Sequence, residues 1–233
     1  MNNTFQGFPT DLITFLEQLS KNNNREWFAE NKQRYRDSVQ IPMSNFIMAL
    51  APGLERTANC FTADPRLNGG SMFRIYRDAR FIKNKPPFKN NVGCQFRHEA
   101  GKNAHAPGFY LHIEPGNIFI GGGIYRPDAN ALFKIRMAIA EKEQQWDQVI
   151  HDKEMKKQYA EVSGESLIRP PRGFSAEHPH IEHLKRKTFF VTKPLQAQQL
   201  YSGSFVQEVE TLFEAASPLM RFLTEAVDLP YSI

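Results

Sequence analysis

Six basic residues and one acid lie between Arg74 and Lys89, in the stretch RIYRDARFIKNKPPFK. The whole chain has a formal net charge of +4, so this stretch, at +5, carries all of the excess and the remainder is −1. Arginine guanidinium groups bind phosphate and carboxylate through paired hydrogen bonds, which suits them better to anions than lysine ammonium groups. We therefore expect Arg74, Arg77 and Arg80 to bind an anionic group and Asp78 to orient them.

Two other interpretations of this stretch remain open. A strand edge with charged side chains resists aggregation, which would account for Lys83, Lys85 and Lys89 without any ligand. Basic residues interleaved with aromatic ones can also contact a nucleic-acid backbone and stack on its bases. Arg77 fits a solvated edge poorly, because strict alternation points it toward the apolar side, where a guanidinium needs a partner.

The segment YLHIE places His112 and Glu114 two residues apart, on the same face of a predicted strand. An imidazole beside a carboxylate can act as a general base with its orienting partner, or both can ligate a metal ion. A solvated, hydrogen-bonded polar pair is the alternative. We take His112, Glu114 and Asp78 as the candidate catalytic residues.

The segment FIGGGIY places Gly121 and Gly123 on the same face as this pair. Glycine inside a strand leaves no side chain to pack and indicates a bulge or a close approach. A ligand or another backbone could occupy the gap. The glycines do not form a nucleotide-binding pattern, so no nucleotide is assigned.

A proline-rich stretch, RPPRGFSAEHPHIEH, carries Arg169 and Arg172, and we expect it to form a flap over the polar face. His178, His180 and His183 look like metal ligands, but they lack cysteine or acidic partners at set spacing, so no metal is assigned. The ligand-binding candidates are Arg74, Tyr76, Arg77, Arg80, Lys85, Gly121, Gly123, Tyr125, Arg169 and Arg172.

Composition narrows the class of protein. The chain has 233 residues, 41% of them hydrophobic and 23% charged, as is ordinary for a globular protein. The segment MNNTFQGFPTD lacks the features of a signal peptide, and no run of 18 or more apolar residues exists to span a membrane. Cys60 and Cys94 give no disulfide framework. We expect a cytoplasmic protein with buried thiols and no membrane contact.

Periodicity predicts how these residues are positioned. A helix begins at Thr10 or Asp11, and a later one is interrupted at Pro42. Asp128 caps a helix that breaks near Lys142. The expected segments are helices over 9–60, a sheet over 71–126, helices over 128–163, a loop and strand over 165–193, and a C-terminal helix over 203–228. These predict one α+β domain over 1–233.

Alternation predicts an antiparallel sheet that packs one face on the N- and C-terminal helices. From about Met72, it places Phe73 and Ile75 on the apolar side and Arg74 and Tyr76 on the polar side. The polar face, covered by the proline-rich flap, would then form a pocket.

The arginine-rich stretch resembles the signature of a bacterial and fungal family known as domain of unknown function 2461. That signature reads R-x-x-R-D-x-R-F, then three residues, then Asp or Asn, then Lys. The matching residues are Arg74, Arg77, Asp78, Arg80, Phe81, Asn84 and Lys85. Phe88 stands where tyrosine is common, so no hydroxyl role is implied there. Three further segments are similar to the opening, middle and later parts of the family's sequences: the opening segment, FYLHIEPGNIFIGGGIYRPD and LIRPPRGFSAEHPHIEHLKRK. The resemblance implies a single cytosolic α+β domain and brings no activity or cofactor.

The leading functional hypothesis is binding of a small phosphate- or carboxylate-bearing ligand in this pocket, with hydrolysis or transfer left open. A nucleic-acid or protein interaction module that uses the basic strip is the first alternative. A metal-dependent hydrolase is the second. The cofactor and the oligomeric state stay unassigned.

Overall fold

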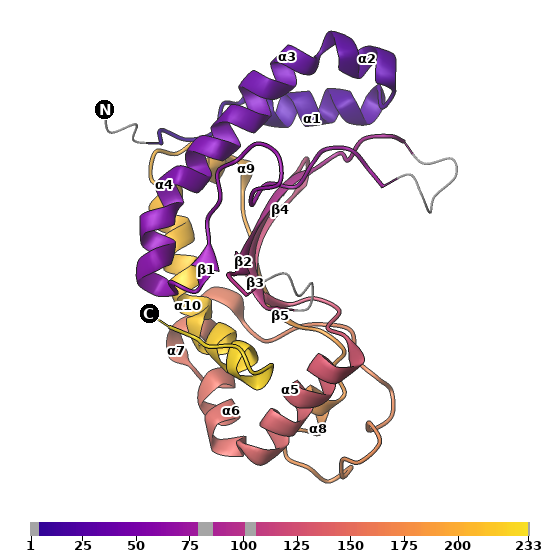
Figure 1. Cartoon of the computed structure of the whole chain (residues 1–233), viewed down its shortest axis with the longest axis vertical. Coiled ribbons are helices and arrows are strands. Elements are labelled where there is room, and N and C mark those ends of the chain that lie inside the picture. Colours follow the sequence, from indigo (N-terminus) through magenta and orange to yellow (C-terminus); the bar gives the residue numbers. More distant parts are fainter. Residues whose placement is uncertain (1–4, 79–85, 101–105, 233) are drawn as a thin grey trace.

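Five strands form one antiparallel sheet in the order β1-β2-β3-β4-β5. The computed structural model describes residues 5–78, 86–100 and 106–232. The strands are β1 (Phe61–Thr62), β2 (Val92–His98), β3 (Gly108–Glu114), β4 (Asn117–Ile124) and β5 (Phe189–Pro194). Helices at both ends of the chain pack on this sheet (Figure 1), which confirms the predicted α+β fold.

The helices begin and end close to the predicted signals. They are α1 (Asp11–Lys21), α2 (Arg25–Glu30), α3 (Lys32–Tyr35), the π-helix η1 (Arg36–Gln40), α4 (Ile41–Thr57), α5 (Ala129–Glu141), α6 (Glu143–Ile150), α7 (Lys153–Tyr159), α8 (Ile181–Leu184), α9 (Ala197–Leu200) and α10 (Phe205–Ala226). The Asp128 carboxylate accepts a hydrogen bond from the amide of Ala131 at 2.7 Å, as a cap should. The predicted interruption at Pro42 is absent, because the backbone stays helical from α3 through the π-helix η1 into α4, and the change to π-helical hydrogen bonding just before Pro42 accommodates the missing amide hydrogen.

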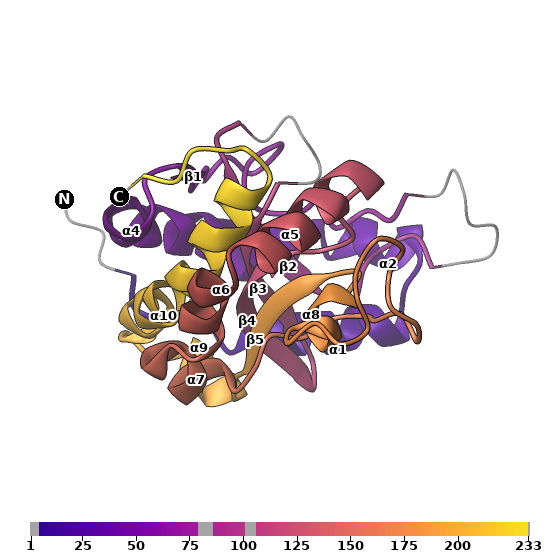
Figure 2. The same ribbon diagram turned by 90° about the horizontal axis from the view of Figure 1, so that it is seen from below.

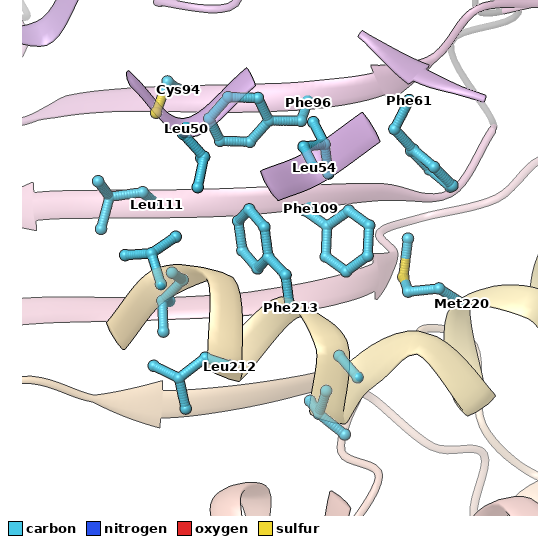
Figure 3. Packing of buried hydrophobic residues seen from close by; sticks show 14 of the residues in the cluster. Leu50, Leu54, Phe61, Cys94, Phe96, Phe109, Leu111, Leu212, Phe213 and Met220 are labelled. Carbon is cyan, nitrogen blue, oxygen red and sulfur yellow. The ribbon is translucent and has the colours of Figure 1, made fainter. Parts of the chain in front are cut away.

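Helices α4 and α10 cover one face of the sheet, here called the inner face, and both views place them on the same side of the strands (Figures 1 and 2). Alternate residues of the central strands point into this layer and are buried: Val92, Cys94, Phe96, Phe109, Leu111, Ile113, Ile118, Ile120 and Ile124. Figure 3 shows Phe213 of α10 against Phe109 of β3, with ring centroids 4.4 Å apart. The inner face is therefore the apolar one that alternation predicted.

Residues 71–78 and 86–91 form two antiparallel arms that extend β2 away from the sheet. Met72 bridges Cys94, and Tyr76 bridges Phe88. Met72 and Tyr76 are four positions apart, whereas their partners Cys94 and Phe88 are six positions apart. The second arm therefore contains a bulge. The predicted sheet over 71–126 was therefore too regular, because 71–78 makes isolated bridges instead of a strand.

The segment 165–187, which includes α8, packs on α5 and α6. Two backbone hydrogen bonds pair its two ends. The amide of Leu167 donates to the oxygen of Lys185 (2.8 Å), and the amide of Lys187 donates to the oxygen of Glu165 (2.6 Å). Figure 1 shows it at the end of the molecule opposite α1, α2 and α3. Throughout the described ranges, no helix is both long and apolar enough to cross a membrane.

Candidate functional site

The two arms are anchored to the N-terminal helices by the turn between α1 and α2. The Asn23 amide accepts from the backbone nitrogen of Phe88 (3.0 Å) and donates to its oxygen (3.1 Å). The Phe88 ring is buried and stacks on Phe28 with centroids 4.1 Å apart. A hydroxyl on this ring would have to be buried between helix and arm, so Phe88 is a structural residue here.

Four cations gather where the arms meet β2: Arg74, Arg77, Lys89 and Arg97. We call them the cation cluster. None of them lies within ion-pair distance of a carboxylate in the described part of the chain. Arg77 instead donates from Nε to the backbone oxygen of Phe88 at 2.7 Å. The cluster therefore concentrates four positive charges at one place on the molecule.

Phe73 lies at the centre of the cation cluster. Lys89 Nζ is 5.3 Å and Arg97 Cζ is 5.9 Å from the centre of its ring. Lys89 Nζ also donates to the backbone oxygen of Arg74 at 2.9 Å. Burial lowers the pKa of Lys89, and the nearby charges of Arg74 and Arg77 lower it further. The ammonium is thus held by the Arg74 oxygen and by the Phe73 ring, and it is one of the cations at this place.

Phe73 itself lies on the polar side of the sheet, here called the outer face. Its ring is 6.0 Å from that of Tyr110, and its amide donates to the oxygen of Gly93. Alternation had placed it on the apolar side. Residues 71–78 make two isolated bridges with a bend at Ile75 between them, so one phase of alternation cannot describe the whole segment.

Three residues of β3 form a hydrogen-bonded row on the outer face: Tyr110, His112 and Glu114. We call them the polar row. The Tyr110 hydroxyl lies 3.0 Å from His112 Nδ1, and His112 Nε2 lies 3.3 Å from a carboxylate oxygen of Glu114. The predicted neighbours His112 and Glu114 are therefore brought together, and Tyr110 joins them.

Neighbouring strands hold the His112 ring in position. Phe119 lies directly across from it on β4 and stacks against it, with centroids 4.7 Å apart and planes 15° from parallel. Asn91 Nδ2 lies 3.2 Å from His112 Nδ1. The imidazole side chain is only 13% exposed. Both ring nitrogens are therefore engaged, and the ring has little freedom to rotate.

The cation cluster and the polar row meet at the contact between Phe73 and Tyr110. One end of the outer face thus supplies fixed positive charge, and the adjacent strand supplies groups that can give or take a proton. Cations and acid–base groups side by side are what a site for phosphate or carboxylate chemistry requires.

Gly121 and Gly123 are accounted for by another backbone. A Cβ at Gly121 would collide with the backbone oxygen of Val191, and one at Gly123 with that of Phe189. Gly123 also has a φ of +147°, which other residues rarely adopt. Close approach of β5, the backbone alternative, explains these glycines, and the space expected for a ligand is filled.

The remaining candidates lie apart or outside the described residues. Tyr76 is 51% exposed and packs edge-on against Phe28, and Tyr125 is 65% exposed near Phe190. Asp78 is half-buried at the end of the first arm. Arg80 and Lys85 lie outside the residues that the structure describes.

The expected flap is held elsewhere. His178 Nε2 lies 3.4 Å from a carboxylate oxygen of Glu143, and His180 Nε2 lies 3.6 Å from one of Asp147. These contacts fix the 165–187 segment on α6. Arg169 and Arg172 are exposed, and no described contact joins them to the outer face. The predicted pocket therefore has no cover from this segment in the described ranges.

A family model described as "Conserved hypothetical protein (DUF2461)" matches residues 11–222. The chain belongs to this family. The match spans α1 to α10 and so includes the cation cluster and the polar row of this DUF2461 protein. No curated protein matches the chain.

Sequence reasoning missed four members of the DUF2461 protein's site: Phe73, Lys89, Arg97 and Tyr110. Arg97 and Tyr110 do alternate with buried residues, and that alternation could have placed both on the outer face. Lys89 gave no such signal, because its position depends on the bulge. In the described ranges, no group of three or more His, Cys, Asp or Glu side chains is arranged to hold a metal ion.

Proposed function

We propose that the outer face binds a small phosphate- or carboxylate-bearing ligand. The cation cluster would hold its anionic group. Among the described residues, no carboxylate lies within ion-pair distance of these four side chains. This concentration of four cations around Phe73 is the observation that carries the proposal. Burial lowers the pKa of Lys89 most, the charges of Arg74 and Arg77 lower it further, and a bound anion would relieve the like-charge part of that cost.

The same proposal gives the polar row a chemical role. His112 would act as acid or base on the bound ligand in a hydrolysis or transfer, with Glu114 orienting its ring. Asp78 would orient the arginines, and Arg80 and Lys85 would add charge near the ligand. We place the protein in the cytoplasm as part of this proposal, since both cysteines are buried free thiols.

Titration calorimetry with inorganic phosphate tests the proposal. Lys89→Met keeps the stem over Phe73 but removes the charge, and Arg97→Gln removes the second ring-bound cation. Each should weaken phosphate binding by about tenfold or more, because a charge-assisted hydrogen bond contributes about 1.5–3 kcal/mol. Lys187→Met and Arg172→Gln remove the same charge at the other end of the molecule and should leave the affinity unchanged.

Equal weakening in all four variants would mean that net charge alone attracts phosphate, and no binding by the wild type would refute the proposal. A gel-shift series over salt, with a single-stranded oligonucleotide, provides the competing outcome. Steep, salt-sensitive binding that requires Lys89 would favour the nucleic-acid module instead.

A further inference from the structure

Asn91 beside Nδ1 and Glu114 beside Nε2 together indicate which ring nitrogen of His112 carries the proton. The Asn91 atom at 3.2 Å is the amide nitrogen Nδ2, which can only donate. A proton on Nδ1 would then oppose the amide hydrogens. Nδ1 is therefore the acceptor, and Nε2 carries the hydrogen that points to Glu114 at 3.3 Å.

This tautomer also decides the role of the Tyr110 hydroxyl, which lies 3.0 Å from the same Nδ1. The hydroxyl must donate to the ring, because the nitrogen has no hydrogen to offer. Two lone pairs of the hydroxyl oxygen then remain available to another group. Tyr110 is the member of the polar row with spare acceptor capacity beside the cation cluster.

Gly93 provides the space in which this hydroxyl lies. A Cβ at Gly93 would be 2.5 Å from the Tyr110 oxygen. Gly93 is directly across from His112 in the β2–β3 register. The missing side chain at position 93 thus lets the phenol reach Nδ1, and any larger residue would push it away.

We infer that Tyr110 is the residue that exchanges a proton with the bound ligand, and that His112 and Glu114 form its proton relay. The inference rests on the proposed function, because the cation cluster must bring the anionic ligand to the phenol. A water or ligand hydroxyl gives its proton to Tyr110 Oη as the phenol's own proton passes to His112 Nδ1. The O–H bond of the nucleophile breaks, and the imidazolium that forms is stabilised by Glu114, while the Asn91 amide must turn away from the new hydrogen on Nδ1.

The surroundings of Tyr110 agree with a relay and disagree with a standing phenolate. Burial raises the pKa of Tyr110 to about 12, and the charges of Cys94 and Glu114 act in the same direction. The phenol therefore stays protonated at neutral pH. It can accept a proton only if it loses its own at the same time, and Nδ1 of His112 is the acceptor in contact with it.

Long-range proton–nitrogen NMR of His112 tests the relay without a known reaction. At neutral pH the wild type should show hydrogen on Nε2 and a hydrogen-bonded, unprotonated Nδ1. Tyr110→Phe and Gly93→Ala should both shift the Nδ1 resonance, the first by removing the hydroxyl and the second by displacing it. Tyr76→Phe removes an exposed hydroxyl on the neighbouring arm and should leave Nδ1 unchanged. Hydrogen on Nδ1 would overturn the relay.

The contact with ligand is tested by phosphate titration of protein labelled at the tyrosine Cζ carbon. The Tyr110 signal should move in the wild type and stay fixed in Lys89→Met. Phosphate that binds by calorimetry without moving this signal would refute proton exchange at Tyr110 but not the proposed function. A wild type that binds no phosphate would refute the proposed function, and the His112 tautomer would then decide whether the relay exists.

Discussion

Histidine, arginine and carboxylate side chains occur both on the outer face and at the contact between segment 165–187 and α6. The two regions differ in which hydrogen bonds and ion pairs these side chains make. On the outer face, each member of the polar row has a hydrogen-bond partner, while the cation cluster has no described counter-charge. On α6, His178 and His180 lie near carboxylates, yet hydrogen bonds are left unmade.

All the buried side-chain polar atoms without a hydrogen bond in the described residues belong to the second region. They are Arg136 Nε, Trp146 Nε1, His178 Nε2, His183 Nδ1 and Arg186 Nε. Each such group costs about 1–3 kcal/mol relative to water. Release of segment 165–187 would return these atoms to solvent, so the segment is held less firmly than its apolar contacts suggest.

The difference separates two uses of polar residues. The polar row has complete hydrogen bonds and therefore a fixed geometry. The positive charge of the adjacent cation cluster is available to a ligand. An interface whose buried donors are unpaired gains little from staying closed, and it favours detachment. We therefore expect recognition at the outer face and motion at segment 165–187.

Truncation of one phenylalanine in each region should give the largest contrast. Phe28→Ala removes a buried ring that stacks on Phe88, and it should lower the free energy of unfolding by about 3–5 kcal/mol. Phe174→Ala, in segment 165–187, removes a half-buried ring and should cost about 1 kcal/mol. Urea denaturation measures both. Equal losses would mean that the two regions are held equally firmly.

Acid should weaken the α6 contact through His183. Burial, with the charges of Arg186 and His180, lowers its pKa to about 4 from 6.5, so the fold favours the neutral ring. This stability is complete above pH 6.5, declines as pH falls toward 4, and amounts to about 3 kcal/mol at most. Chemical denaturation at intervals between pH 7 and 4 measures the decline.

Two histidine variants isolate that effect from other titrations. His183→Gln removes the titrating ring and should flatten the curve between pH 6.5 and 4. Glu182 and Asp147 also face His183, and their charges oppose the shift. His151→Gln, on exposed α6 surface beside Asp147, should leave the decline unchanged. Parallel curves for the wild type and His183→Gln would show that His183 is not responsible.

The smallest contrast comes from two polar side chains. Asn23→Ala removes the paired hydrogen bonds to the Phe88 backbone and should cost about 2 kcal/mol. Arg136→Met removes one bond, from Nη2 to the oxygen of Arg186, but also a half-buried charge and an unpaired nitrogen. Its effect should lie within about 1 kcal/mol of zero. A large loss from Arg136→Met would contradict the view that this interface is poorly satisfied.

The sequence was sufficient for features set by neighbouring positions. Alternation in 92–124 predicted the inner face, because adjacent side chains in a strand point to opposite sides. His112 and Glu114 meet for the same reason. The cap at Asp128 and the break at Lys142 are equally local, and the structure confirms both.

Features that depend on a distant backbone could not be predicted in this way. Gly121 needs β5, which follows much later in the chain. Phe73 and Lys89 come together only because the arms pair across a bulge. Arg77, which alternation directed toward the apolar side, is satisfied by the backbone oxygen of Phe88 on the opposite arm.

The position of α10 has a consequence for synthesis of the chain. Its side chains cover the inner face of strands that precede it, including the stack of Phe213 on Phe109. While a ribosome is still making residues 205–226, those strands have emerged with an uncovered apolar face. Chains grow at about 5–20 residues per second, so this face waits for its helix. During that interval the nascent chain offers a site for chaperones, and an abrupt stop before α10 would leave an aggregation-prone product.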